Sequence, residues 1–154
     1  MDTGAITAAL QAASSQPWAL QEERATSVAA LLLDASAGRP VTEGALARAL
    51  GPGKMAAADV RQIRTAGGKI TAVVPVQGII LYDFDFPPFA TGMRQLAATM
   101  RELAADGAVD QIVLDIGSFG GTVTGVEEAA EAIFKARQRK PVIARAQFEL
   151  SESV

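Results

Sequence analysis

The chain has 154 residues, which is enough for one domain with a hydrophobic core. Its 17 acidic and 14 basic residues give a formal charge of −3, so we expect no nucleic-acid partner, because phosphate binding needs clustered Lys and Arg. Cysteine and histidine are both absent, which excludes disulfides, Cys/His zinc sites and histidine-based catalytic triads within these residues. Any hydrolytic chemistry would need another base, such as lysine, and no metal or cofactor is expected.

No targeting or membrane segment stands out. Residues 1–13 lack a positively charged start followed by a long apolar run, and no apolar run reaches the roughly 20 residues that span a bilayer. These features predict a cytoplasmic protein without a membrane partner.

Residues 1–50 are predicted to form a helical N-terminal segment. Val28 and Leu31 recur near helical spacing, and Pro40 interrupts the pattern. Thr42 can then cap a short helix over residues 43–50. Residues 51–69, rich in glycine and small side chains, are predicted to be a linker.

A β-rich segment follows at Ile70–Leu81. Pro75 cannot donate a ladder hydrogen bond, so this strand is expected to lie at a sheet edge or to bend there. A helix is predicted next, because four apolar residues are spaced three, four and three apart: Met93, Leu96, Met100 and Leu103.

A second strand is predicted from Val109 to Ile116, followed by a loop over residues 117–121. A second helix is expected from about residue 122 to 137, and Pro141 begins a third strand. The apolar side of this helix is predicted to be Val123, Val126, Ala130, Ile133 and Phe134.

The order β-α-β-α-β predicts an α/β fold with a parallel sheet and right-handed helical crossovers. We expect this domain to cover residues 70–154. Its pattern ends just inside the third strand, so the domain is expected to be incomplete at its C-terminus.

The segment Asp115–Gly125 is the candidate functional site. It follows a parallel strand, and ligands of open α/β folds bind at the carboxyl ends of such strands. The N–H groups of Gly120 and Gly121, beside the start of a helix, could stabilise an oxyanion. The alternative is that this glycine pair only makes a tight strand-to-helix connection.

Other candidates have simpler explanations. Ser118 has no histidine to activate it and is expected to be a solvated loop serine. Asp83 and Asp85 could serve acid–base work or bind a cation, but we expect an exposed loop with packed aromatic neighbours. Trp18 is expected to be a packing anchor, with a partner contact as the alternative. Three acidic residues suit the start of a helix: Glu127, Glu128 and Glu131.

Three segments are distinctive in their order along the chain. Ala72–Ile80 is an apolar strand with Pro75 and a late glycine, Asp115–Val123 holds the glycine pair, and Ala129–Ala144 is a helix followed by a strand. Together they resemble the signal peptide peptidase A-like serine peptidases (serine peptidase family forty-nine). The N-terminal helical part with Trp18 is similar to the phage head-maturation members.

The resemblance implies a Clp-protease/crotonase-like fold, a homo-oligomer and a Ser-Lys catalytic dyad. It implies that Gly120 and Gly121 form the oxyanion hole, with Gly121 as the direct donor. The implied partner is a protein or peptide substrate such as a capsid scaffold, and the implied location is the host cytoplasm or the procapsid.

Two departures from the family pattern bear on activity. Gly117 stands where the family usually has Asp and Phe119 where it has Pro, which should loosen the oxyanion site. The family's nucleophilic serine would align near Glu152, where Ser151 and Ser153 are weak candidates outside the expected alanine-rich helix.

The family's general-base lysine lies beyond residue 154, and Lys135 and Lys140 match non-catalytic positions. We therefore expect a serine endopeptidase-related chain that is inactive in this form. The alternatives are a peptidase completed by a segment outside this sequence and a non-enzymatic assembly module that keeps the oligomerising half of the fold.

Overall fold

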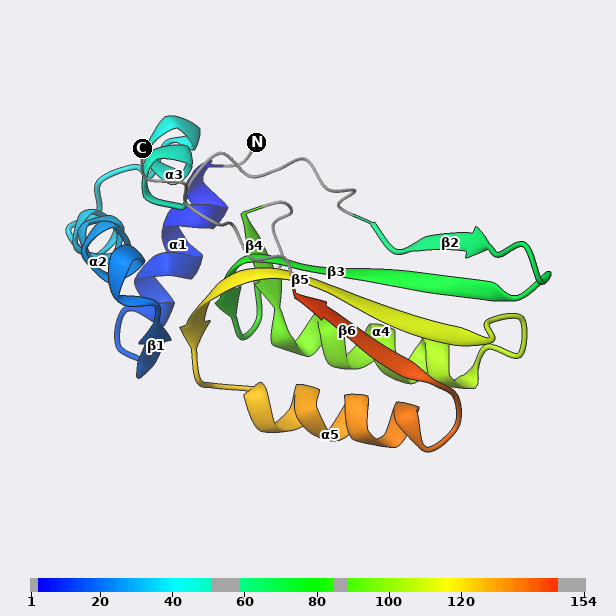
Figure 1. Ribbon diagram of the computed structural model, residues 1–154. Coiled ribbons are helices and arrows are strands. Elements are labelled where there is room, and N and C mark those ends of the chain that lie inside the picture. Colours follow the sequence, from blue (N-terminus) through cyan, green and yellow to red (C-terminus); the bar gives the residue numbers. More distant parts are fainter. Residues whose placement is uncertain (1–2, 51–58, 85–88, 147–154) are drawn as a thin grey trace.

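The computed structural model describes residues 3–50, 59–84 and 89–146. Its helices are α1 (Thr3–Ala13), α2 (Glu22–Ser36), α3 (Glu43–Leu50), α4 (Met93–Ala105) and α5 (Val126–Arg137). Its strands are β1 (Trp18–Leu20), β2 (Arg61–Arg64), β3 (Ile70–Leu81), β4 (Ala90–Gly92), β5 (Gln111–Thr122) and β6 (Val142–Ala146). The strands form one six-stranded sheet, with α4 and α5 together on one face (Figure 1).

The centre of the sheet is parallel. β5 lies between β3 and β6, and both neighbours run in its own direction, joined through α4 and α5. The predicted β-α-β-α-β order is therefore confirmed. The parallel sheet is only part of the observed one, which is mixed, because β1 and β2 add antiparallel strands to β5 and β3. The α/β class is confirmed, and the Clp-protease/crotonase-like fold stays a prediction.

Part of the segment expected to be a linker is a strand. β2 pairs with the start of β3, from Arg61 opposite Val73 to Arg64 opposite Ile70. The turn between them is closed by the Thr65 N–H, which donates to the Lys69 carbonyl at 2.8 Å. Residues 51–58 of the same segment lie outside the described part of the chain.

Pro75 lies in an interior strand rather than at the edge of the sheet. On one side of β3 the whole strand pairs with β5, while on the other side β2 reaches only Val73 and β4 starts at Ile79. The Gln77 N–H, which faces that second side, donates to Thr91 Oγ1 at 2.8 Å. Because N–H directions alternate along a strand, the missing N–H of Pro75 falls in the gap between β2 and β4.

A cluster of buried side chains between α4, α5 and the sheet, here called the sheet cluster, forms one core. The predicted apolar stripe of α4 is confirmed, because all four of its residues are buried. The members of the sheet cluster are Ala72, Val74, Val76, Met93, Leu96, Ala97, Met100, Leu103, Val109, Ile112, Leu114, Ala129, Ala132 and Ala136.

The predicted apolar side of α5 is wrong. Val126 and Phe134 are 46% and 56% exposed, while the buried positions of this helix are alanines. Small side chains let α5 approach α4 and the sheet closely. Of the predicted residues Ile133 packs at the margin of the sheet cluster, whereas Val126 and Phe134 are left on the outer side.

A second core, here called the helical cluster, lies between α1–α3 and the carboxyl ends of β3 and β4. Ile79 and Leu81 enter it from β3, on the opposite face from Val74 and Val76. The predicted cap of α3 is confirmed, because the Ala45 N–H donates to Thr42 Oγ1 at 3.2 Å. The other members are Ile6, Leu10, Ala13, Val28, Leu31, Ala35, Val41, Leu46, Ala49, Phe89 and Ala90.

Candidate functional site

The glycine segment predicted as a loop is the last part of a strand. β5 continues without a break to Thr122, and α5 begins only at Val126 rather than near residue 122. The strand persists because backbone on both sides pairs with it: β3 on one side and β1 on the other. In Figure 1 the end of β5 curves away from the parallel centre towards β1.

β1 closes the end of β5 as an antiparallel strand. Trp18 lies opposite Thr122, Ala19 opposite Gly121 and Leu20 opposite Gly120. Hydrogen bonds flank this register: the Gln21 N–H donates to the Phe119 carbonyl at 3.0 Å, and the Val123 N–H donates to the Pro17 carbonyl at 3.1 Å. β1 has no recognisable sequence signal, because three residues are too few to show an alternating pattern.

The two glycines are required by close backbone approach. A Cβ on Gly120, whose φ is +104°, would lie 2.1 Å from the Ala19 carbonyl oxygen. A Cβ on Gly121 would lie 2.0 Å from the Ile80 carbonyl oxygen. The register between β3 and β5 also shifts here, between Gly78 and Ile80. Any larger residue would separate β5 from one of its neighbours.

Both candidate oxyanion donors have acceptors in this structure. Hydrogen-bonded pairs alternate along an antiparallel ladder, so Ala19 and Gly121 form the hydrogen-bonded pair between the two flanking bonds. By this alternation the Ala19 carbonyl is the acceptor expected for the Gly121 N–H. The Gly120 N–H donates to Ser118 Oγ at 3.2 Å. The oxyanion assignment stays a prediction, and in this conformation neither amide is open to a ligand.

Ser118 is not the solvated loop serine expected from the sequence. It is half-buried, and its hydroxyl donates to the Gly78 carbonyl at 2.7 Å while accepting from the Gly120 N–H. The side chain thus joins β5 to β3 at the register shift. Its hydroxyl proton is engaged with a backbone carbonyl, which is a structural role.

A charged pair that sequence reasoning missed lies just upstream. Asp115 is 2% exposed, and the Arg145 guanidinium binds its two carboxylate oxygens through Nε at 2.9 Å and a terminal nitrogen at 2.9 Å. Gln77 donates from Nε2 to the Asp115 carbonyl at 2.8 Å. The sequence does contain a signal for this pair: an acidic residue inside an apolar strand needs a partner of opposite charge.

Gly117, one of the two departures from the family pattern, faces Gln77. A Cβ at this position would lie 2.3 Å from Gln77 Oε1. Gly117 therefore leaves the space that the Gln77 side chain occupies beside the strand. Phe119, the other departure, packs against the helical cluster, and Arg24 lies 5.8 Å from the centre of its ring.

The remaining candidates have structural roles. Asp83 forms an ion pair with Arg94 at 2.6 Å, whereas Asp85 lies outside the described residues. The Trp18 indole N–H donates to the Ala13 carbonyl at 2.9 Å, and its ring packs on the helical cluster, which confirms a packing role. Glu127 and Glu128 are in the first turn of α5, as expected.

Lys135 and Lys140 both have structural partners. Lys140 Nζ donates to the carbonyl of Leu103 in the last turn of α4 at 2.8 Å, and to the carbonyls of Asp106 and Val109 just after the helix at 2.7 and 2.8 Å. Lys135 pairs with Glu131 at 2.7 Å, and this hydrogen bond lowers the pKa of the Glu131 carboxyl. The positions expected near the nucleophile, Ser151, Glu152 and Ser153, lie outside the described residues.

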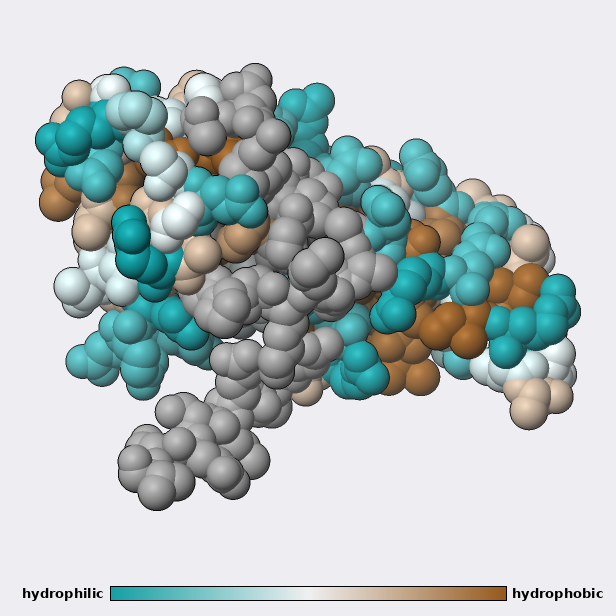
Figure 2. All heavy atoms as spheres, turned by 90° about the horizontal axis from the view of Figure 1, so that it is seen from above, coloured by the Kyte–Doolittle hydropathy of each residue, from teal (hydrophilic) through white to brown (hydrophobic). Residues whose placement is uncertain are grey.

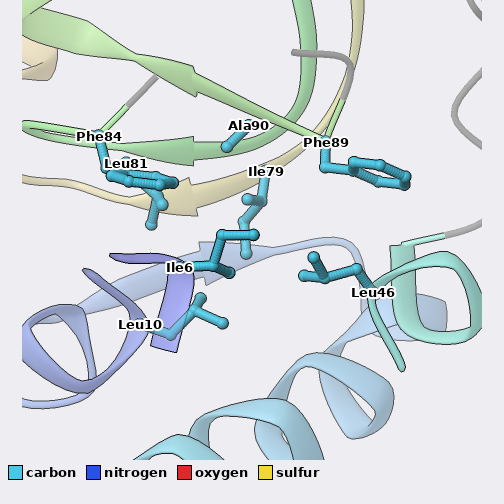
Figure 3. Close-up of a pocket in the computed structure, with 8 residues that line it drawn as sticks. All are labelled: Ile6, Leu10, Leu46, Ile79, Leu81, Phe84, Phe89 and Ala90. Atoms are coloured by element: carbon cyan, nitrogen blue, oxygen red, sulfur yellow. The ribbon is translucent and has the colours of Figure 1, made fainter. Parts of the chain in front are cut away.

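An apolar pocket lies within the helical cluster, where α1 and α3 meet the ends of β3 and β4 (Figure 3). It encloses a cavity of about 10 Å³, no larger than the space for one water molecule. The side chains that line it are all apolar, so they offer no hydrogen bond to a ligand. The lining residues are Ile6, Leu10, Leu46, Ile79, Leu81, Phe84, Phe89 and Ala90.

Two negative findings apply to residues 3–50, 59–84 and 89–146. No group of three or more acidic residues there is placed to hold a metal ion. No helix in the same ranges is long and apolar enough to cross a membrane.

Comparisons with known proteins point in one direction. No family model matches the chain. The chain is 36% identical over 74 residues to the head-tail preconnector protein GP5 of Enterobacteria phage P21, a match that covers 46% of this chain and 15% of that protein. It is also 36% identical over 78 residues to the capsid assembly protease C of Escherichia phage lambda, covering 49% of this chain and 18% of the relative. The chain is thus similar over about half of its length to two phage proteins, and it spans less than a fifth of the length of either one.

Proposed function

We propose that this chain carries the oxyanion-binding half of a phage capsid maturation peptidase of the signal peptide peptidase A-like type. The observation that carries the proposal is the glycine pair at the carboxyl end of the central parallel strand, where Gly121 lies five positions before Val126, the first residue of α5. Ligands bind at this end of parallel sheets, and backbone amides beside a helix start suit a developing oxyanion. The names of the two relatives support the capsid role.

Catalysis would follow the Ser-Lys scheme that the resemblance implies. A lysine would take the proton from a serine hydroxyl, and the Gly121 N–H would stabilise the oxyanion formed when that serine attacks a peptide carbonyl. Within the described residues, Lys135 and Lys140 are held by other partners and Ser118 donates to Gly78. We therefore propose that the chain is inactive in this form and that the substrate is a protein of the assembling capsid, such as a scaffold.

The DNA following the codon for Val154 tests this proposal most directly. In this frame or another, it should encode an alanine-rich helix with a serine, and a lysine further on. Labelling of the purified chain with a serine-reactive fluorophosphonate, read by mass spectrometry, should find no modified serine. A DNA sequence lacking any such frame would remove the peptidase origin, and labelling at Ser151 or Ser153 would remove the proposed inactivity.

A second candidate is an assembly module without enzymatic activity. It is favoured by apolar side chains on the surface: Val126 and Phe134 on α5, and Ile63 and Ile143, 48% and 50% exposed, on the strands. Figure 2 shows hydrophobic surface among the hydrophilic residues over the part of the sheet opposite α4 and α5. Light scattering after size exclusion should then show a defined oligomer that Phe134→Ser weakens, whereas a monomer would exclude this candidate.

A further inference from the structure

The edge of β5 at Phe119–Val123 is built to hold an extended segment. β1 lies on it in antiparallel register, through the Gln21–Phe119 and Pro17–Val123 hydrogen bonds and the Ala19–Gly121 pair. A Cβ on Gly120 would meet the Ala19 carbonyl, so this glycine admits the backbone of a strand at that position. Main-chain hydrogen bonds of this kind are how proteins bind extended peptides by strand addition.

β1 also fills side-chain positions beside that edge. Trp18 and Leu20 point to the same side and pack against the helical cluster, while Ala19, between them, is exposed. A peptide on this edge would need the same pattern of two large apolar residues separated by one small residue.

We propose that β1 is an internal occupant of a peptide-binding site and that it must leave before an extended apolar–small–apolar segment of a protein substrate can bind there. The inference deepens the proposed function and rests on it, because it treats the Gly121 amide as part of the substrate site. With β1 in place, the Ala19 carbonyl is the acceptor expected for that amide. The closed edge is therefore an autoinhibited state of the site.

The connections of β1 allow it to move without unfolding the rest of the molecule. It is three residues long and, among the described strands, pairs only with β5. Ile6 and Leu10 of α1 and Val28 and Leu31 of α2 stay anchored in the helical cluster. Residues 14–21 between these helices can extend to roughly 25 Å, enough to leave the edge.

Native-state hydrogen exchange on the unmodified chain is the first test. If β1 opens alone, the amides of Gly121, Gln21 and Val123 should exchange together. The free energy of this opening should be lower than the one measured at the Leu114 amide in the parallel centre. Exchange of the β1–β5 amides only with global unfolding would overturn the proposal, because β1 would then be a permanent strand.

A peptide-binding assay is the second test. The probe is a fluorescein-labelled peptide copying residues 15–23, followed by anisotropy. Ala19→Pro removes the N–H that donates to Gly121 in the hydrogen-bonded pair, so we expect roughly tenfold tighter peptide binding than to the unmodified chain. Ala19→Ser keeps that N–H and is the matched control, with unchanged binding expected.

The single tryptophan gives an independent readout. In Ala19→Pro, Trp18 emission should shift to the red while far-UV circular dichroism stays the same. A folded Ala19→Pro variant that binds the peptide no better than Ala19→Ser would overturn the proposal. If Ala19→Pro fails to fold, the hydrogen-exchange result on the unmodified chain decides.

A second peptide tests the side-chain preference. Serine at both apolar positions of the probe should reduce its affinity for Ala19→Pro by more than tenfold, because two buried contacts are lost. Equal binding of the two peptides would overturn the proposed preference. These assays measure binding only, so a DNA sequence without the serine and lysine would defeat the proposed catalysis and leave their result standing.

Discussion

The two ends of the central sheet are built by different rules. At the amino end, β3, β5 and β6 form a regular parallel ladder covered by α4 and α5, and the sheet cluster fills the space between them. At the carboxyl end, the register between β3 and β5 shifts and β5 contains two glycines, which have no side chain to bury. β1 pairs with this edge, and the N-terminal helices pack beside it. The first end provides stability through side-chain burial, whereas the second depends on backbone contacts that can open locally.

Met100→Ala should break the regular end. Met100 is a residue of α4 and is fully buried in the sheet cluster. Its truncation leaves a cavity and should cost about 2–5 kcal/mol in the free energy of unfolding. Gln95→Ala, at an exposed position of the same helix, is the control and should change little. Urea denaturation followed by circular dichroism measures both; equal effects would show that α4 is not part of the core.

Lys140→Met should be the next largest effect. The Lys140 ammonium donates to three carbonyls at and just after the C-terminal end of α4. Its loss should cost about 3 kcal/mol, because charged hydrogen bonds are strong and their acceptors are left unsatisfied. Lys135→Met is the matched control, since Lys135 is exposed and pairs only with Glu131 on the surface. A stability loss in the control as large as that in Lys140→Met would refute the structural role of Lys140.

Gly120→Ala should act only at the irregular end. Its positive φ and the nearby Ala19 carbonyl disfavour a Cβ, at a cost of about 1–2 kcal/mol. We expect β1 to loosen, seen as faster hydrogen exchange at Gln21 and Val123, while amides of β5 near Leu114 keep their protection. Uniform loss of protection across the sheet would show that the two ends unfold as one unit.

The Glu131–Lys135 pair should give the smallest effect. The hydrogen bond from Lys135 lowers the pKa of Glu131 in the folded chain. The pair's contribution is therefore present above the pKa of glutamate in the unfolded chain and is lost as the pH falls through the lower, folded value. Both side chains are exposed, so Glu131→Gln should barely change the unfolding midpoint at pH 7. A clear destabilisation at pH 7 would contradict this.

Much of the regular end could be predicted, since periodicity reports burial directly. The stripe Met93, Leu96, Met100 and Leu103 placed α4, and the apolar runs placed β3, β5 and the start of β6. The prediction of the buried side of α5 is wrong, because its buried residues are alanines, which add little to a hydrophobic pattern although they pack closely against the core. The sequence indicates the two candidate glycines but not their pairing with β1. It also does not indicate the Asp115–Arg145 ion pair, because these residues are 30 positions apart.

The sequence by itself determined the α/β order, the positions of the two glycines, the cap at Thr42 and the exclusion of histidine and cysteine chemistry. These follow from local rules of spacing, turn chemistry and composition. Only the tertiary structure decided that Gly120 and Gly121 lie inside a strand with their amides engaged. The reason is physical: a backbone amide has no sequence signature, and its partner is chosen by whichever chain segment packs beside it, here residues 18–20 held there by α1 and α2.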